Sequence, residues 1–120
     1  MAWEFKKNLP LFVQISDRIR RDIVLGTYSA GEQLPTVRQL AFTASANPNT
    51  VQHALAILED EGLIVTRGTA GKFITSDAEL LCAARKKIKA QAIEGLLKEA
   101  LELGISAEEI VEYVKEAHGI

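Results

Sequence analysis

Apolar residues recur at helical spacing along the first part of the chain. The first stretch lies between Pro10 and Gly26, and its apolar positions are three or four residues apart: Phe12, Ile15, Ile19 and Ile23. Proline is tolerated in the first turn of a helix, and glycine commonly ends one. Charged residues fall between the apolar positions, so the pattern predicts an amphipathic helix that ends at Gly26.

Capping residues predict two further helices. Thr36 and Gln39 have capping-box spacing, and a helix of about ten residues follows with Val37, Leu40 and Ala41 inward. Asn47 is a preferred N-cap and Pro48 is favoured just inside a helix, so a third helix begins at Pro48. Gly62 is its expected end. At 100° per residue, Asn49 and His53 point away from the apolar stripe of this helix, which is Val51, Ala54, Leu55 and Leu58.

Beyond Gly62 the pattern changes. The runs 63–66 and 72–75 are rich in β-branched and aromatic residues and flank a glycine-containing stretch, which predicts a two-stranded hairpin that must lean on the helices. Helical periodicity returns after Ser76-Asp77 and ends at Gly104, and a capping box at Ser106 opens a last helix. The expected fold is mainly α with a small β-hairpin (α+β): a winged helix-turn-helix over residues 1–75 and a two-helix tail over residues 76–120.

Length and composition narrow the class of protein. The 120 residues are 48% hydrophobic and 25% charged, so a core can form, but no second full-sized ligand domain fits. A single cysteine, no signal-peptide pattern and no membrane-length apolar stretch predict a cytoplasmic protein without a membrane partner. The net charge of −2 divides unevenly, because residues 1–75 hold eight Lys/Arg against seven Asp/Glu and residues 76–120 hold six against nine. A nucleic-acid surface is therefore expected to be local and to lie in the first segment.

The predicted arrangement suits the DNA major groove. It consists of two helices joined by a tight turn; the second helix begins with a polar, capped turn and is followed by a hairpin. Asn and Gln can bond adenine bidentately, and Thr can touch a phosphate or a thymine methyl. Arg38 can reach a phosphate or a guanine edge, and Arg67 and Lys72 flank the hairpin tip, where small residues permit close approach to DNA. The candidate DNA-binding residues on the helices are Thr36, Arg38, Asn47, Asn49, Thr50, Gln52 and His53.

Several short motifs in fixed order resemble the DNA-binding domain of the GntR family of bacterial regulators. They are LPLFVQI at 9–15, IVLGTY at 23–28, GEQLPTVRQLA at 31–41, NPNTVQHAL at 47–55 and EGLI at 61–64. The opening of the third helix and the short tail resemble the YtrA-like subfamily. The resemblance implies a homodimer on a roughly palindromic operator, with DNA contacts at Arg38, Asn47, Asn49, Thr50 and Gln52 and wing contacts at Arg67, Gly71 and Lys72. Pro48, Gln52 and His53 stand where some members carry Arg or Lys, so the base preference of those members does not transfer.

Structural roles remain open at several of these positions. Arg38 and His53 can be solvated surface residues, and Asn47 can serve as a cap alone. The basic cluster at 85–89 fits a solvated face or a weak attraction to flanking DNA. His53, His118 and Cys82 lack metal-ligand spacing, and no enzyme signature or cofactor motif is found, so neither a metal nor a cofactor is expected.

The tail carries a long apolar stripe with little else in its own chain to pack against. We expect this stripe to be buried against a second subunit: Leu81, Ala84, Ile88, Ala92, Ile93, Leu96, Leu97, Ala100, Ile110 and Val114. Because the tail is too small for a sensing domain, an unidentified small-molecule effector would bind at the dimer interface or between tail and winged helix. The expected outcome is repression by blocking a promoter. The alternative is a winged-helix protein-interaction module without DNA binding, which the near-neutral charge of residues 1–75 keeps open.

Overall fold

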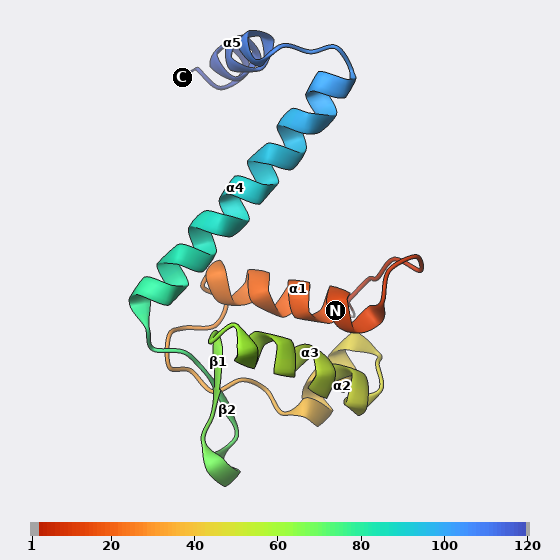
Figure 1. Ribbon diagram of the computed structural model, residues 1–120, viewed down its shortest axis with the longest axis vertical. Coiled ribbons are helices and arrows are strands. Elements are labelled where there is room, and N and C mark those ends of the chain that lie inside the picture. The colour runs from red at the N-terminus through yellow and green to blue at the C-terminus, as the bar shows by residue number, and fades with distance from the viewer. Residues whose placement is uncertain (1–2, 120) are drawn as a thin grey trace. The chain divides into compact units, whose positions relative to one another are not determined.

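The computed structural model describes residues 3–119 and contains the predicted order of helices and hairpin (Figure 1). Its elements are α1 (Leu11–Val24), α2 (Val37–Ala44), α3 (Pro48–Asp60), β1 (Ile64–Thr66), a 3-10 turn (Gly68–Ala70), β2 (Lys72–Ile74), α4 (Ala78–Glu102) and α5 (Ala107–His118). The fold is that of a winged helix-turn-helix followed by two helices, as predicted. No helix in this part of the chain is long and apolar enough to cross a membrane.

The chain divides into two compact units, Met1–Arg85 and Lys86–Ile120. The division lies about two turns into α4, ten residues past the boundary expected at residue 75. Leu81 and Ala84 are partly buried and pack against the core of the first unit, and Arg85 donates from Nε to the carbonyl of Val24 at 2.7 Å. The first turns of α4 therefore belong with the winged helix, and Arg85 stabilises the C-terminal end of α1.

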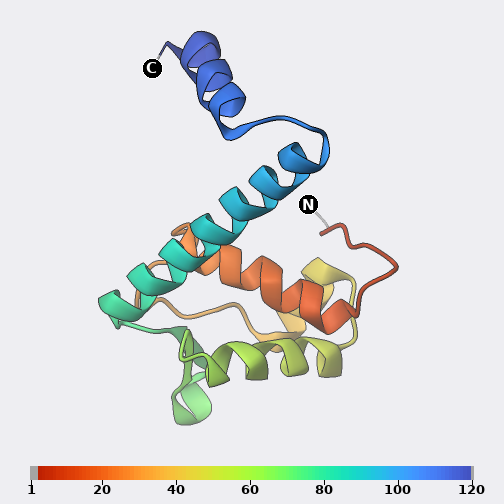
Figure 2. The ribbon, with the colours of Figure 1, turned by 45° about the horizontal axis from the view of Figure 1, so that its top comes forward.

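The core of the first unit lies between α1, α2, α3 and the hairpin, with α1 packed along α3 (Figure 2). The predicted inward positions of α1 and α3 are buried, apart from Phe12, which is half-buried. On α2, Leu40 and Ala41 are buried and Val37 packs at the edge of the core. Each fully buried Leu, Ile or Val contributes about 1.5–3 kcal/mol of transfer free energy, so this core is the main source of stability of the unit.

The hairpin pairs β1 with β2 in antiparallel register, with Ile64 opposite Ile74 and Thr66 opposite Lys72. Ile64 and Ile74 are buried against the helices. A third segment also pairs with β2: Gln33 forms an isolated antiparallel bridge with Phe73, and the amide of Leu34 donates to the carbonyl of Lys72 at 2.9 Å. The stretch before α2, where the sequence indicates only turns, thus supports a hairpin that would be marginal alone.

The second unit contains the later part of α4 and all of α5. The Ser106 capping box is formed, because its hydroxyl accepts from the Glu109 amide at 3.1 Å and the Glu109 carboxylate accepts from the Ser106 amide at 3.3 Å. No described residue of α4 or α5 is buried. A shallow groove of about 710 Å³, mostly apolar, lies where α4 ends and α5 begins, and Leu97 and Leu101 line it.

Candidate nucleic-acid interface

The turn between α2 and α3 presents polar groups at the surface. Ser45 ends α2 in the left-handed conformation with φ 53°, and Asn47 caps α3 by accepting from the amide of Asn49 onto Oδ1 at 2.8 Å. The predicted cap is therefore confirmed. Asn47, Asn49 and Gln52 are exposed and Thr50 is half-buried. Oδ1 of Asn47 serves the cap, whereas Nδ2 makes no hydrogen bond within residues 3–119, so its N–H groups remain available as donors.

The opening turn of α3 also favours an anion. The first turn contains no acidic side chain, so nothing on the helix neutralises the partial positive charge of its N-terminal amides. The arrangement can therefore offer donors to the acceptor atoms of base edges and phosphates.

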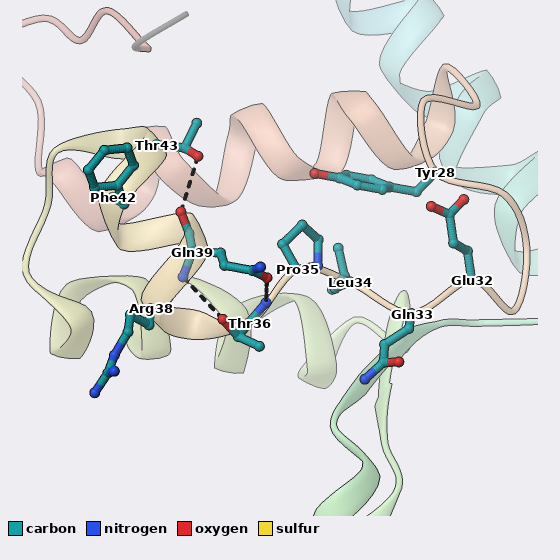
Figure 3. Close-up of a pocket in the computed structure, with 10 residues that line it drawn as sticks. All are labelled: Tyr28, Glu32, Gln33, Leu34, Pro35, Thr36, Arg38, Gln39, Phe42 and Thr43. Carbon is teal, nitrogen blue, oxygen red and sulfur yellow. Dashed lines mark hydrogen bonds between the residues drawn. The ribbon is translucent and has the colours of Figure 1, made fainter.

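Thr36 and Arg38 lie at the start of α2. The Thr36 hydroxyl accepts from the Gln39 amide at 3.1 Å, and the Gln39 side-chain oxygen accepts from the Thr36 amide at 2.8 Å, which confirms the predicted capping box. Arg38 is exposed, and its guanidinium has no hydrogen-bond or ion-pair partner in the described chain. Figure 3 shows it extending outward from an open groove of about 870 Å³ that Tyr28, Pro35 and Phe42 also line.

The hairpin tip carries the second candidate arginine. The amide of Arg67 donates to the carbonyl of Gly71 at 2.9 Å, and the amide of Ala70 donates to the carbonyl of Arg67 at 3.0 Å. The guanidinium carbon of Arg67 lies 4.9 Å from the centre of the Phe73 ring, a cation–π contact that leaves the side chain exposed. The tip therefore has a closed backbone and one cation at its surface.

Lys72, also predicted at the wing, is engaged within the chain. Its ammonium forms an ion pair with Glu59 near the end of α3 and donates to Thr66 Oγ1 at 3.0 Å. The hydrogen bond from Lys72 lowers the pKa of Glu59 below its ordinary value. In the structure Lys72 thus ties β2 to α3, and Glu59 offsets its charge.

His53 is exposed, as its position on α3 predicts, but one face of its ring is covered. It stacks on Phe12 of α1 with ring centres 3.9 Å apart and planes 13° apart. This stack also accounts for Phe12, which the helical pattern assigns to the core and which instead lies half-buried at its edge. The stack fixes the plane of the imidazole ring, and with it the directions in which the ring nitrogens can form hydrogen bonds.

Ion pairs neutralise some of the positively charged side chains of the first unit and so determine which of them can attract an anion. Arg20 of α1 bonds Asp17 at 2.7 Å and Glu61 at 2.6 Å, and the hydrogen bond with Glu61 raises its pKa. Arg18 is paired with Asp22 at 3.3 Å. Much of the basic face predicted for α1 is therefore neutralised, whereas the arginines at the start of α2 and at the hairpin tip have no acidic partner in the described chain.

Two further residues beside the interface are absent from the sequence-based candidates. Gln33 sits next to the hairpin and Phe42 is 88% exposed on α2. Neither position belongs to a sequence pattern that indicates binding. An exposed glutamine or a single aromatic residue on the surface is an ordinary feature of a protein. The position of Gln33 emerges only when the segment before α2 is placed against β2.

Comparison with known proteins identifies relatives over most of the chain. The family model described as bacterial regulatory proteins of the gntR family matches residues 11–74. The uncharacterized HTH-type transcriptional regulator YhcF of Bacillus subtilis is 34% identical over 112 residues, which covers 93% of each chain. The HTH-type transcriptional repressor YtrA of the same organism is 31% identical over 112 residues and 92% of this chain, or 86% of YtrA.

Solved structures of other proteins also resemble this chain. A GntR family transcriptional regulator from Listeria monocytogenes superposes with a TM-score of 0.86 at 38% identity, covering 93% of this chain and 98% of its own. The DNA-binding domain of AraR, solved in complex with operator ORX1, shares the fold with a TM-score of 0.55 at 21% identity, covering 62% of this chain and 92% of that chain.

Proposed function

The chain belongs to the GntR family of bacterial regulatory proteins, and we propose that it represses transcription as a cytoplasmic homodimer bound to an inverted-repeat operator. It is a DNA-binding transcription regulator, not an enzyme, and its similarity to YtrA over most of the chain supports the YtrA-like subfamily. The repressor name of YtrA supports repression, and the operator complex of the AraR domain supports an operator as the target.

The exposed opening turn of α3 is the observation that carries the proposal. Asn47 uses its oxygen to cap the helix and keeps its Nδ2 group as a donor, and Asn49 and Gln52 are exposed in the same turn and the next. The amides of Asn49 and Gln52 match the paired donor and acceptor that adenine presents in the major groove, and Asn47 adds a single donor. Arg38 and Arg67 supply unpaired positive charge for the DNA backbone or for a guanine edge.

The second unit supports a dimer. Of the large hydrophobic side chains exposed among the described residues, most lie in this unit: Ile93, Leu96, Leu101, Leu103, Val111, Tyr113 and Val114. Apolar surface of this extent on a short helical tail is costly in water and is favourable when two copies bury it together. Two subunits would present their recognition helices about 34 Å apart, one turn of DNA. An effector bound between the tails would change this spacing.

The test uses the intact chain and a random pool of duplexes of about 40 base pairs, long enough for two half-sites. We expect the bound fraction to converge on an inverted repeat, the affinity to fall steeply with salt, and the complex to contain two chains of 13.1 kDa. Convergence on no sequence, or binding that does not depend on salt, would refute the proposal and favour the protein-interaction alternative.

The variant Arg38→Ala tests the proposal most directly. If Arg38 bonds a guanine edge, the change weakens binding to the selected duplex by about 1–3 kcal/mol for each half-site and relaxes the preference at one base pair of each half-site. Arg21→Ala, which removes an exposed arginine from the last turn of α1, is the matched control and should leave affinity and preference unchanged. Equal losses in the two variants would contradict a specific role for Arg38.

A further inference from the structure

Gln33 connects the start of the helix-turn-helix to the tip of the wing. Its backbone forms the antiparallel bridge with Phe73 of β2, and its side-chain Nε2 donates to the carbonyl of Ala70 at 2.6 Å. Figure 3 shows its amide directed toward the hairpin. Through this bond a side chain from outside the hairpin reaches the 3-10 turn at the tip.

The two ends of this connection each carry a residue proposed to touch DNA. Gln33 lies shortly before Thr36 and Arg38, with only Leu34 and Pro35 between it and the capping box of α2. At the other end, the amide of Ala70 donates to the carbonyl of Arg67 at 3.0 Å. The Gln33 amide is thus separated from Arg67 by one residue and two hydrogen bonds.

We propose that Gln33 is a positioning residue, which holds the wing tip so that Arg67 meets the DNA in register with Arg38. The inference rests on the proposed function, because it needs both arginines to contact one duplex. The tip residues 67–70 are all exposed, and the side chain of Arg67 contacts only the ring of Phe73 within its own hairpin. Without the Gln33 bond this tip would sample other orientations, and DNA binding would have to order it at an entropic cost.

The residue at position 71 supports this role. Gly71 has a φ of +116°, which L-residues rarely adopt, and a Cβ placed there would lie 2.8 Å from Nε2 of Gln33. The close approach of the glutamine amide to the tip therefore depends on a glycine at this position. Gly71 thus acts in the wing through its lack of a side chain, which lets Gln33 reach the carbonyl beside it.

The variant Gln33→Met tests the proposal, because methionine keeps the length of the side chain and removes the donor. In the free protein we expect amide hydrogen exchange at Arg67 and Ala70 to become about fivefold faster, the effect of losing one hydrogen bond of ordinary strength. Gln91→Met, at an exposed position of α4, is the matched control and should leave both rates unchanged. Unchanged exchange in Gln33→Met would overturn the inference.

DNA binding separates positioning from a general loss of stability. On the duplex selected by the wild-type chain, Gln33→Met should bind about three- to tenfold more weakly, with a shallower salt dependence, because the contact it supports is with the DNA backbone. In an Arg67→Ala background the same change should have no further effect, because the residue it positions is gone. An equal loss in both backgrounds would refute the role.

The two proposals fail in different ways. If the wild-type chain shows no salt-dependent binding, the proposed function is wrong, and the role of Gln33 in DNA binding is wrong with it. If the wild-type chain binds and Gln33→Met binds equally well, only the role of Gln33 is refuted.

Discussion

Replacing Asn47 by aspartate should move stability and DNA binding in opposite directions. The Asn47→Asp side chain would retain an oxygen in place of the one that accepts from the Asn49 amide at 2.8 Å, and aspartate is as good an N-cap as asparagine. Its negative charge would also interact favourably with the N-terminal end of α3, by about 0.3–1 kcal/mol. Asn47→Ala, by contrast, loses the cap and about 1 kcal/mol, which corresponds to a melting temperature lower by about 4–8 °C for a domain of this size.

DNA binding, by contrast, should be weakened by the negative charge of the Asn47→Asp side chain. A carboxylate about 6 Å from a phosphate is repelled by about 0.7 kcal/mol at the dielectric constant of water and by about 3 kcal/mol at an effective value of about 20. The Nδ2 donor of Asn47 is lost as well. Each recognition helix should therefore lose about 1–3 kcal/mol of binding free energy, and a dimer should lose about twice that.

The assay compares thermal unfolding of the free proteins with titrations of the selected duplex at several salt concentrations. Asn47→Asp should melt at or above the temperature of the wild type and bind at least about thirtyfold more weakly, the effect of about 2 kcal/mol. Asn47→Ser keeps a capping oxygen without the charge and serves as the control. An Asn47→Asp protein that is stable and binds as tightly as wild type would refute the placement of this turn against DNA.

Two other predictions test the wing and the tail. Glu59→Gln should lower the melting temperature at neutral pH, because Lys72 holds the pKa of Glu59 below its ordinary value and the ionised pair stabilises the fold. This difference from wild type should begin to shrink as the pH falls through the ordinary carboxyl pKa of about 4.3, and it should disappear only below the lowered pKa that Glu59 has in the folded protein; a difference as large at a pH of about 2 as at neutral pH would contradict it. Leu96→Asp should raise the dimer dissociation constant by about a hundredfold or more in sedimentation experiments, because two apolar side chains worth about 1.5–3 kcal/mol each are lost; an unchanged constant would place Leu96 outside the interface.

The elements of the fold could be predicted because their signals are local. Thr36, Asn47 and Ser106 each cap the helix that the sequence assigns to them, and the glycines at 26, 62 and 104 follow helix ends with positive φ. A cap bonds an amide two or three residues away, so the residues that make it are visible in a short window of sequence. The apolar stripes of α1 and α3 are equally local and coincide with the core.

The contacts that shape the candidate site are not local, and periodicity contains no information about them. Lys72 reaches Glu59 across the end of α3, and Gln33 reaches a carbonyl 37 positions away in the sequence. The tail shows the same limit, because its apolar stripe looks like one continuous surface from Leu81 onward. Only the structure reveals that Leu81 and Ala84, at the start of this stripe, pack on the core of the first unit.

The charge of the chain shows why such contacts matter for function. With a net charge of −2 the whole molecule would repel DNA. Within the first unit, however, Arg18, Arg20 and Lys72 are paired with carboxylates, and these pairs remove both positive and negative charge from the surface. Arg38 at the start of α2 and Arg67 at the hairpin tip are among the cations that have no acidic partner in the described chain. Charges farther away than about 10 Å are screened by salt. The electric field that a duplex meets at short range therefore depends mainly on which cations remain unpaired and only weakly on the net charge of the chain.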